Sequence, residues 1–511
     1  MTVTGKVDVV VIGSGFAGTL AADRLVSGGL SVVMLERGPW RDTLPVRSMG
    51  IAERTPFPRG RALFTDTLRS VHHRWLPKNG ITLNRRGLFE VFFGEGLSSV
   101  CSSSVGGGSH VYSALFRYPQ VEGFWDGICD GMSNEEMAPH YERVLASFKM
   151  ITPSPALKVP HQAAERFGPD GPMQAPTAVP PTWLGFLFPE EIGKHRRITD
   201  ENGIERVEMD YNDPDSHGFL GSPSGAKTTL DFLFIGPMLK RGLVLHDLAE
   251  ATTIIAQPRG MPARYRVDYR DHRRGEIRAL HTDHVVLGAG SVNTMKILLH
   301  SRDVTKTLSG MPQLGRRIGG NGDLFAFWDY NEPGRHLCTG LPFHGGFQLK
   351  DPNYPLPLGG GGWPAAETYP LPGFLKERIK RAAFTNCMGV DTMDGSVSME
   401  NGRLKLRFDS RNSPIYDQVK ATFRRVSEVT GRRIYYPKHP ITVHCLGGAC
   451  MDRDVDHGVV DAQGEIFDNP GLYVADGAVF PRIPGGPPTF TIAAWAARLG
   501  EKIVEKLRHA P

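Results

Sequence analysis

Residues 7–36 read VDVVVIGSGFAGTLAADRLVSGGLSVVMLE. The segment opens with a largely β-branched run, typical of a strand buried on both faces of a parallel sheet. A helical alternation of apolar and polar residues then starts at Phe16 and ends at Gly28-Gly29, and a second strand runs on to Glu36. The pattern predicts a strand–helix–strand unit at the start of an α/β domain.

Three glycines at the first strand–helix junction, Gly13, Gly15 and Gly18, have the spacing G-x-G-x-x-G. Gly13 permits a tight turn, Gly15 lets the backbone approach a pyrophosphate, and Gly18 lets the helix pack close to the strand. The helix N-terminus supplies free N–H groups for phosphates. Glu36 ends the second strand, where a carboxylate can accept hydrogen bonds from ribose hydroxyls. The unit therefore predicts a dinucleotide site and leaves open whether it holds FAD or NAD.

The composition is that of a globular protein with more than one core. The chain has 511 residues, of which 40% are hydrophobic and 22% charged, so we expect two domains or one large α/β domain with insertions. The formal charge is only +5, and the Arg-rich stretches 270–278 and 423–433 also contain acids. A nucleic-acid partner would need denser, one-sided basicity, so none is expected.

Six cysteines, at positions 101, 129, 338, 387, 445 and 450, lack paired metal-ligand spacing. They fit free thiols in a reducing compartment. His444 with Cys445 and Cys450 is a poor match to a zinc site, so no metal is predicted. The N-terminus enters a strand at once, and no 18-residue apolar run is present. We expect a cytoplasmic protein without an integral membrane segment, and loose membrane association stays open.

The rest of the chain alternates regular and irregular segments. Residues 284–301 repeat the strand–glycine–helix junction, which is usual in flavoproteins that bind two dinucleotides. The small-residue run 94–119 suits backbone that passes close to a flat ligand. We expect irregular structure over 41–90, loops and a domain change over 151–224, and helices over 133–150, 225–242 and 487–507. Residues 389–408 predict a hairpin, with an Asp-Gly turn at 394–395, then strands, then Asn401-Gly402.

Six motifs, in this order, make the chain resemble the glucose–methanol–choline (GMC) family of FAD-dependent oxidoreductases, and the bacterial branch that contains the cholesterol oxidases looks most similar. They are GSGFAG with Glu36, VGGGSHVYSA (105–114), GAKTTLDF (225–232), VVLGAGSVNT (285–294), LGRRIGGNGD (314–323) and HCLGG (444–448) with GLYVADGAVFP (471–481) and GGPPTFTIAA (485–494). Segments 151–224 and 330–435 carry almost none of the resemblance.

The resemblance implies an α/β fold in which a Rossmann-like, two-dinucleotide-type FAD-binding domain is interleaved with an antiparallel-sheet α+β substrate domain. The FAD-binding parts would be residues 1–45, 225–325 and 441–511, the last of which carries the catalytic histidine. Residues 86–150 would face the flavin, 151–224 would form a substrate-side segment, and 326–440 the substrate domain.

The resemblance also implies the cofactor residues. Gly108, Tyr112, Ser113 and Leu115 would lie against the flavin, Ala251 near the adenine, and Asp476 with Gly477 near the ribityl and pyrophosphate. With the two glycine junctions and the last helix, the expected set is Gly13, Gly15, Phe16, Ala17, Gly18, Glu36, Gly107, Gly108, Tyr112, Ser113, Leu115, Ala251, Gly288, Ala289, Gly290, Asp476, Gly477, Pro488 and Thr489.

His444 matches the family's histidine beside flavin N5. Oxidation of an alcohol removes a hydride from carbon, which the flavin accepts, and a proton from oxygen. Imidazole is a suitable proton acceptor because its ordinary pKa lies near neutrality. A single histidine at a strand end is otherwise more often structural, so the catalytic role depends on the six motifs.

Two departures from the family pattern stand out. Pro487 occupies the position of the usual Asn or His partner opposite the first histidine, and proline has neither a side-chain donor nor an N–H. Thr489 could substitute weakly. Cys445 replaces the family's proline, and we have no account of that change. The sterol oxidases also use a substrate-domain carboxylate, for which Glu367 and Glu400 are candidates by proximity only. His110 stands one position before the site of covalent attachment in some relatives, so we expect noncovalent FAD.

Three functions remain open at this point. The first is oxidation of a small-molecule alcohol, bulky and apolar and sterol-like in type, to a carbonyl, with O₂ or a quinone or protein as electron acceptor. The second is a non-oxidative or light-driven FAD reaction such as that of a lyase, isomerase or decarboxylase, which the absent partner at Pro487 favours. The third is a nicotinamide-dependent dehydrogenase or a non-catalytic nucleotide-binding protein.

Overall fold

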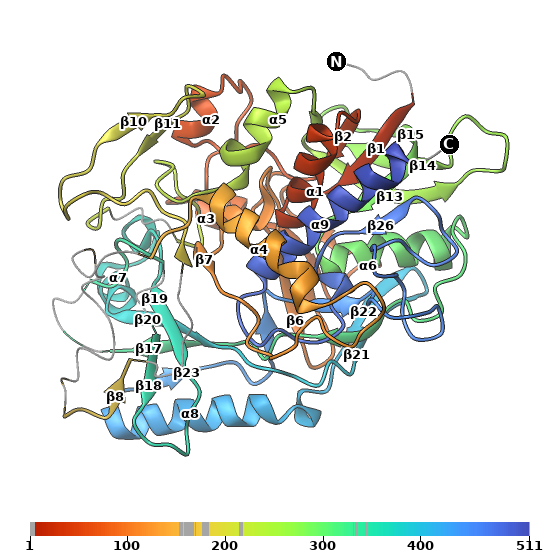
Figure 1. The fold of residues 1–511 in the computed structure, drawn as a ribbon. Helices are drawn as coiled ribbons and strands as arrows, with labels where there is room; N and C mark the ends of the chain where they lie inside the picture. Colours follow the sequence, from red (N-terminus) through yellow and green to blue (C-terminus); the bar gives the residue numbers. More distant parts are fainter. Residues whose placement is uncertain are drawn as a thin grey trace.

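A mixed sheet carries the dinucleotide signature (Figure 1). The computed structural model describes residues 6–152, 157, 168, 170–175, 183–213, 218–330, 332, 336–342 and 346–509. Four neighbouring strands pair in parallel in the order β12-β2-β1-β15, and β26 pairs in parallel with the end of β15. Beyond β15, β14 and β13 are antiparallel. The strands are β1 Val7–Ile12, β2 Val32–Leu35, β12 Val244–His246, β13 Ala249–Ala256, β14 Tyr265–Asp271, β15 Glu276–Leu287 and β26 Leu472–Val474.

Long helices pack beside this sheet. Helix α1 (Phe16–Ser27) follows β1, and α9 (Thr489–Arg508) packs against both α1 and α4 (Asn134–Phe148). The approach of α1 and α9 is close, because a Cβ on Gly500 would lie 2.7 Å from the carbonyl oxygen of Ala21. Strand β1 is completely buried from Val9 to Val11, as its β-branched run predicts. Helix α6 (Ser291–Leu299) follows β15 at the second glycine junction.

An antiparallel sheet forms a second core. Its order is β23-β17-β20-β19-β18-β8, and α8 (Pro414–Thr430) contributes Tyr416, Val419, Phe423 and Val426 to the core that it shares with this sheet. Figure 1 shows α8 beneath the sheet. The strands are β8 Met173–Gln174, β17 Leu324–Asp329, β18 Gly346–Leu349, β19 Leu358–Gly362, β20 Ala382–Cys387 and β23 Ile434–Tyr435. The predicted α/β fold with an antiparallel second sheet is confirmed.

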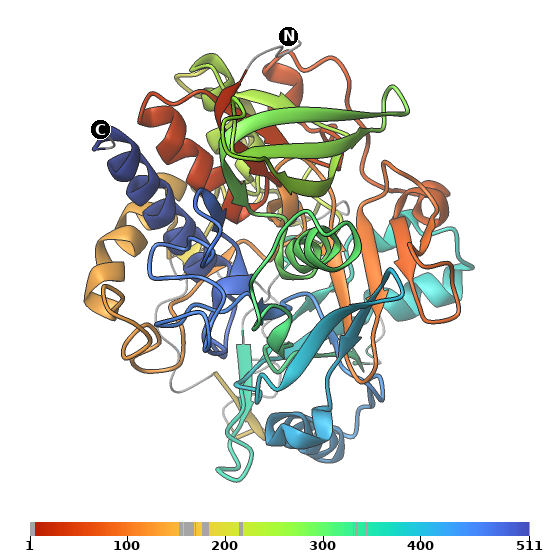
Figure 2. The ribbon, with the colours of Figure 1, turned by 90° about the vertical axis from the view of Figure 1, so that its right-hand side faces the viewer.

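Two smaller sheets connect these parts. One has the order β24-β6-β5-β3-β4 and the other β22-β21-β16-β25. Figure 2 shows β3 to β6 of the first sheet in orange at the right. Their strands are β3 Leu68–His72, β4 Ile81–Thr82, β5 Phe89–Phe93, β6 Ser98–Ser102, β16 Arg316–Gly319, β21 Gly395–Glu400, β22 Arg403–Arg407, β24 Ile441–Thr442 and β25 Leu446–Gly448. Because β24 pairs in parallel with β6, the segment before His444 is held beside residues 98–99.

Three local expectations need correction. Residues 41–90 are not irregular, since they hold α2 (Leu44–Ser48), α3 (Ala62–Asp66), β3 and β4 and enter β5. Residues 225–242 do not form one helix, because a π-helical turn over Asp231–Ile235 precedes α5 (Gly236–Lys240). The 389–408 hairpin exists with Asn401-Gly402 at its turn, both at positive φ, whereas the expected Asp-Gly turn at 394–395 is wrong, because Gly395 is the first residue of β21.

The other expected helices are confirmed, and Ser133 caps α4 by accepting a hydrogen bond from the Glu136 N–H. Within the expected loop region 151–224, residues 183–207 add the short strands β9 (Trp183–Leu184), β10 (Arg197–Thr199) and β11 (Glu205–Val207). Residues 153–156, 158–167, 169, 176–182 and 214–217 of that region lie outside the described residues.

Candidate active site

One large cavity joins the glycine junctions to the antiparallel sheet. Its volume is about 1280 Å³, and both apolar and charged side chains line it. This exceeds the roughly 300–1,000 Å³ of common small-molecule sites. The cavity therefore has room for a large cofactor together with a second molecule.

The glycines of the first junction form a cradle that side chains would fill. A Cβ on Gly107 would lie 2.5 Å from the Cα of Gly15, and one on Gly13 would lie 2.4 Å from the carbonyl oxygen of Gly288. A Cβ on Gly15 would meet no atom within 4 Å, so it would point into open space, and no side chain caps the N-terminus of α1. Free N–H groups beside open space at a helix start suit a pyrophosphate, so this end of the cavity fits a dinucleotide.

Hydrogen bonds hold the carboxylate of Glu36 in one position just after β2. It is only 5% exposed, and its Oε2 accepts hydrogen bonds from the N–H and Oγ of Ser14, 3.0 and 2.7 Å away. Its Oε1 accepts a hydrogen bond from the Gly38 N–H at 2.7 Å. The carboxylate still lines the cavity, so it can accept further hydrogen bonds, as the ribose prediction requires.

Asp476 joins the C-terminal strand to the second glycine junction. Its Oδ2 accepts hydrogen bonds from the Gly290 N–H at 2.9 Å and from the Thr294 Oγ1 at 2.5 Å, and its Oδ1 accepts one from the Ala478 N–H. Burial raises the pKa of Asp476 to about 6. The aspartate holds β26, α6 and the loop after β15 in one arrangement at the edge of the sheet.

The cavity brings together nearly all of the predicted site residues. It is lined by Gly13, Gly15, Phe16, Ala17, Glu36, Gly107, Gly108, Tyr112, Ser113, Leu115, Ala251, Gly288, Ala289, Gly290, His444, Asp476, Gly477, Pro487, Pro488 and Thr489. Gly18 is the exception. A Cβ there would lie 1.9 Å from the carbonyl oxygen of Gly13, so its role is the close packing of α1 on β1.

The side chain of His444 faces the cavity and is oriented from behind by Asp323. Nδ1 of His444 lies 2.8 and 3.1 Å from the two carboxylate oxygens of Asp323, which is completely buried. Thr442 Oγ1 donates a hydrogen bond to the same carboxylate at 2.7 Å and accepts one from the His444 N–H. A carboxylate can only accept, so Nδ1 carries the proton and the Nε2 of the neutral ring is free to accept another.

A short loop fixes Asp323 in turn. Residues 320–323 connect β16 to β17, and Asp391 accepts hydrogen bonds from the N–H groups of Gly320 and Gly322 at 2.7 and 3.2 Å. Asn321 in the same loop donates from Nδ2 to the carbonyl oxygen of Gly486 at 2.9 Å. One loop therefore positions both the histidine and the segment that ends in Pro487.

The sequence prediction missed Asp323, although the residue ends the LGRRIGGNGD motif. Its signal was an acid at the entry of a buried strand (Leu324 is 0% exposed). Nothing in the local sequence reveals that the partner of Asp323 stands 121 residues later.

Pro487 and Thr489 line the cavity as predicted, but Pro487 presents no polar side-chain atom there. Gln120 lies against the same segment. Its N–H donates to the carbonyl oxygen of Pro484 at 2.8 Å, and a Cβ on Gly486 would lie 3.0 Å from its Nε2. Gln120 and Asn386 are amides that line the cavity and that sequence reasoning did not identify.

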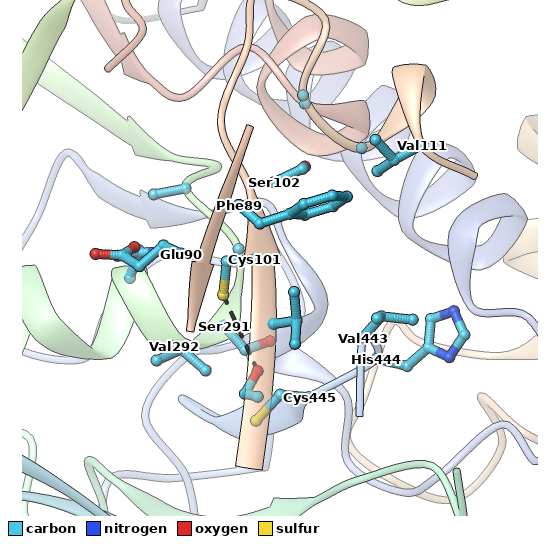
Figure 3. A pocket seen from close by; sticks show the side chains of 18 of the residues that line it. Phe89, Glu90, Cys101, Ser102, Val111, Ser291, Val292, Val443, His444 and Cys445 are labelled. Atoms are coloured by element: carbon cyan, nitrogen blue, oxygen red, sulfur yellow. Dashed lines mark hydrogen bonds between the residues drawn. The ribbon is translucent and has the colours of Figure 1, made fainter. Parts of the chain in front are cut away.

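Two thiols line the cavity between His444 and the ion pairs described below. Figure 3 shows the imidazole of His444 and the thiol of Cys445 pointing away from each other, with Cys101 on the neighbouring strand. Burial raises the pKa of Cys101 to about 11 and also raises the pKa of Cys445. Both thiols are protonated near neutral pH, so neither is a ready nucleophile.

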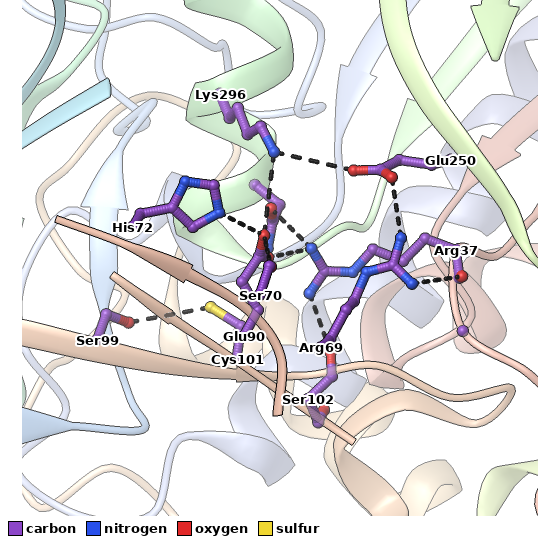
Figure 4. Close-up of polar contacts among 12 residues, drawn as sticks. Arg37, Arg69, Ser70, His72, Glu90, Ser99, Cys101, Ser102, Glu250 and Lys296 are labelled. Carbon is purple, nitrogen blue, oxygen red and sulfur yellow. Dashed lines mark hydrogen bonds and ion pairs between the residues drawn. The ribbon is translucent and has the colours of Figure 1, made fainter. Parts of the chain in front are cut away.

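A buried network of ion pairs lines another part of the cavity, beside Ala251 and Glu36 (Figure 4). Glu90 pairs with Arg37 and accepts from Ser70 and His72, each 2.9 Å from its Oε1. Glu250 lies 2.9 Å from Arg69 and 3.8 Å from Lys296. Burial alone would raise the pKa of Glu90, but Arg37, Lys296 and His72 together hold it well below its usual range. Each charge in this network has a partner of opposite sign, because an unpaired buried charge would strongly destabilise the fold.

Aromatic side chains line the opposite, antiparallel-sheet part of the cavity. Phe384 on β20 lies at the centre, with ring centroids 4.8 Å from Trp363, 5.2 Å from Phe325 and 5.3 Å from Phe219. All four rings line the cavity, and so do the glycines 359–361 of β19. This part can bury a large, flat apolar group.

The remaining candidates lie away from the cavity lining. Glu367 pairs with Lys380 and His336, and Glu400 pairs with Arg407 and Lys405. Both are surface acids with about 40% exposed side chains. His110 is completely buried and its Nε2 lies 2.7 Å from the carbonyl oxygen of Val105, so it packs behind the glycine run.

Among the described residues, no group of three His, Cys, Asp or Glu side chains could hold a metal ion, and no described helix is long and apolar enough to cross a bilayer.

Comparison with known proteins agrees with this geometry. Residues 412–496 match the family model described as GMC oxidoreductase, and residues 6–56 match an FAD binding domain. A cholesterol oxidase from Acinetobacter baumannii is 23% identical over 96% of this chain and 93% of its own. A C-glycoside 3-oxidase from Arthrobacter globiformis is 25% identical over 48% of this chain and 50% of its own. The crystal structure of pyridoxine 4-oxidase from Mesorbium loti covers 99% of this chain and 100% of its own, with a TM-score of 0.56 and 14% identity, and so shares the fold.

Proposed function

Because the chain is an FAD-dependent oxidoreductase of the GMC family, similar to the cholesterol oxidases, we propose that it oxidises a bulky, largely apolar alcohol to a carbonyl with His444 as proton acceptor. Bound FAD supplies the acceptor for the hydride that the alcohol carbon loses. The residues of this chain supply binding, orientation and the removal of the hydroxyl proton. A nicotinamide-dependent enzyme, the third function left open by the sequence, is thereby set aside.

The glycine cradle, Glu36 and Asp476 are the groups proposed to hold the cofactor, which we expect to bind noncovalently. The cradle leaves open space beside free N–H groups for the pyrophosphate, and Glu36 retains lone pairs for ribose hydroxyls. His110 is buried behind the glycine run and does not line the cavity, which supports noncovalent binding. The domain boundaries given by the resemblance remain part of this proposal.

The single observation that supports the base role best is the hydrogen bond between His444 and Asp323. Since Asp323 accepts a hydrogen bond from the Nδ1–H of His444, Nε2 has a free lone pair and can take a proton from a substrate hydroxyl. The buried carboxylate also stabilises the imidazolium that then forms. Two hydrogen bonds hold Asp323 in place, one from Thr442 Oγ1 to its carboxylate and one from its own N–H to the carbonyl oxygen of Gly320.

The substrate preference is argued from the aromatic part of the cavity. Phe219, Phe325, Trp363 and Phe384 line one part of the cavity, and Asn386 lies beside them as the strand partner of Phe325. Aromatic walls with few polar groups favour an apolar body with one hydroxyl over a sugar. We propose O₂ as the electron acceptor, in line with the oxidases to which the chain is similar, with a quinone or protein acceptor as the alternative.

Pro487 favours one competing function. With proline at this position, no polar side chain brackets the substrate oxygen opposite His444. A lyase, isomerase, decarboxylase or light-driven enzyme on this scaffold would not need such a side chain.

The test is to mix the purified yellow protein anaerobically with sterols, long-chain alcohols, aromatic alcohols and sugars, and to follow the flavin absorbance near about 450 nm. Bleaching by apolar alcohols supports the proposed function. Absence of bleaching by every alcohol, with product formed from another substrate without net flavin reduction, would favour the competitor.

A further inference from the structure

The segment 59–86 concentrates the positive charge of the molecule. It contains seven Arg or Lys residues and one acid, Asp66, which is a formal charge of +6, while the rest of the chain has 52 basic and 53 acidic residues. Its exposed cations are Arg61, Arg74, Lys78, Arg85 and Arg86. None of these five forms an ion pair with a residue in the part of the chain that the structure describes. We call this surface the basic rim.

The basic rim also exposes large apolar side chains. Trp75 is 79% exposed, Phe64 75%, Leu83 59% and Ile81 40%. Water solvates such side chains poorly, so several of them beside unpaired cations mark a binding surface. The guanidinium of Arg74 lies over the Trp75 ring, 4.9 Å from its centroid.

Strand pairing and hydrogen bonds fix the parts of the basic rim, since β3 pairs with β4 and side-chain hydrogen bonds brace the neighbouring residues. The Nδ2 of Asn84 donates hydrogen bonds to the carbonyl oxygen of Thr65 and the carboxylate of Asp66, at 3.1 and 2.9 Å, which ties the end of α3 to the residues after β4. The loop 73–80 is braced by Arg403, which donates to the carbonyl oxygens of His73 and Arg74. In Figure 2 the strands β3 to β5 lie on the right-hand side of the molecule, away from both termini.

The same segment borders the cavity. Leu63, Thr67, Lys78, Asn79, Thr82 and Arg85 are among the residues that line it. A partner seated on the basic rim would therefore lie at an edge of the space that holds cofactor and substrate.

We propose that the basic rim docks the protein on an anionic phospholipid surface. Cations attract the negative surface of such a bilayer, and Trp and Phe side chains insert at the boundary between headgroups and acyl chains. An acidic protein could form ion pairs with the cations of the basic rim. It would not by itself explain why Trp75 and Phe64 are 79% and 75% exposed. The benefit for catalysis, delivery of a poorly soluble alcohol from the lipid to the cavity, rests on the proposed function.

Co-sedimentation of the FAD-loaded protein with vesicles tests the proposal. We expect binding to phosphatidylcholine–phosphatidylglycerol vesicles at least about 10-fold tighter than to phosphatidylcholine vesicles, and weaker binding as salt is raised. Arg74→Gln with Lys78→Gln should lower the affinity by about 10-fold or more. Phe64→Ser with Trp75→Ser should lower it on both kinds of vesicle.

The matched controls are Lys194→Gln with Arg411→Gln for charge and Phe374→Ser for exposed aromatic area, since Phe374 is 73% exposed on α7 (Gly373–Lys380). These variants should bind vesicles as the unchanged protein does. No sedimentation with anionic vesicles, or equal losses in rim and control variants, would overturn the proposal. Because sedimentation needs no turnover, vesicle binding without flavin bleaching by any alcohol would contradict only the proposed function.

Discussion

The carboxylate of Asp323 lies directly behind the imidazole of His444, with Oδ2 2.8 Å from Nδ1, while the other side of the ring lines the cavity. The two residues come from the entry of β17 and the end of the short strand β24, and Thr442 bonds to the same carboxylate. This arrangement fixes the tautomer of His444 and gives the ring one accepting nitrogen. It is the feature that makes His444 suitable as a base.

Replacing Asp323 tests this arrangement. In Asp323→Asn the amide can donate to Nδ1 and so favour the ring tautomer that carries its proton on Nε2. We expect flavin reduction by substrate to slow by about 10–100-fold, with FAD still bound. Rapid mixing under anaerobic conditions measures the rate, and Asp329→Asn on the same strand is the control. An unchanged rate in Asp323→Asn would show that Asp323 does not orient the base.

The substitution Pro487→Asn tests whether a polar side chain opposite His444 would assist the reaction. If the proposed oxidation merely tolerates its absence, Pro487→Asn restores a polar group at the cavity and should raise turnover or reactivity with O₂ by several-fold, up to about 10-fold for one added hydrogen bond of about 1.4 kcal/mol. Steady-state oxygen consumption is the measurement. No gain in either quantity would strengthen the non-oxidative alternative.

Phe384 tests the apolar preference of the substrate part. Because its ring contacts three other aromatic rings that line the cavity, Phe384→Ala should raise the KM for apolar alcohols about 10-fold and change kcat less. The exposed Phe374→Ala on α7 is the matched control. Equal KM values for the two variants would contradict a substrate site at these rings.

The pH dependence of stability depends in part on His140. Burial, together with the Arg143 and Arg498 cations, lowers the pKa of His140 from 6.5 to about 4. Between these values the unfolded chain binds a proton that the folded chain does not, so stability falls as the pH drops from 6.5 to 4. Urea midpoints at pH 7 and pH 5 should differ less in His140→Gln than in the unchanged protein. The same difference in both proteins would show that His140 does not contribute.

The sequence predicted best what is local. The strand and helix around Gly13–Gly18, the junction at Gly288–Gly290 and the cap of α4 follow from short-range patterns, and the structure has them as expected. Asp323, Gln120 and the Phe384 cluster could not be found in this way, because their roles arise from contacts between segments that are distant in the chain. The strands between residues 68 and 93 were missed since β4, with two residues, and the polar β3 offer little periodicity.

Anaerobic flavin reduction in His444→Ala tests the base assignment. The control is His457→Ala, since His457 is half-exposed and does not line the cavity. We predict that His444→Ala binds FAD normally but is reduced by its alcohol substrate about 10²–10⁴-fold more slowly, while His457→Ala is unchanged. Reduction of His444→Ala at the rate of the unchanged protein would contradict the assignment of His444 as the base.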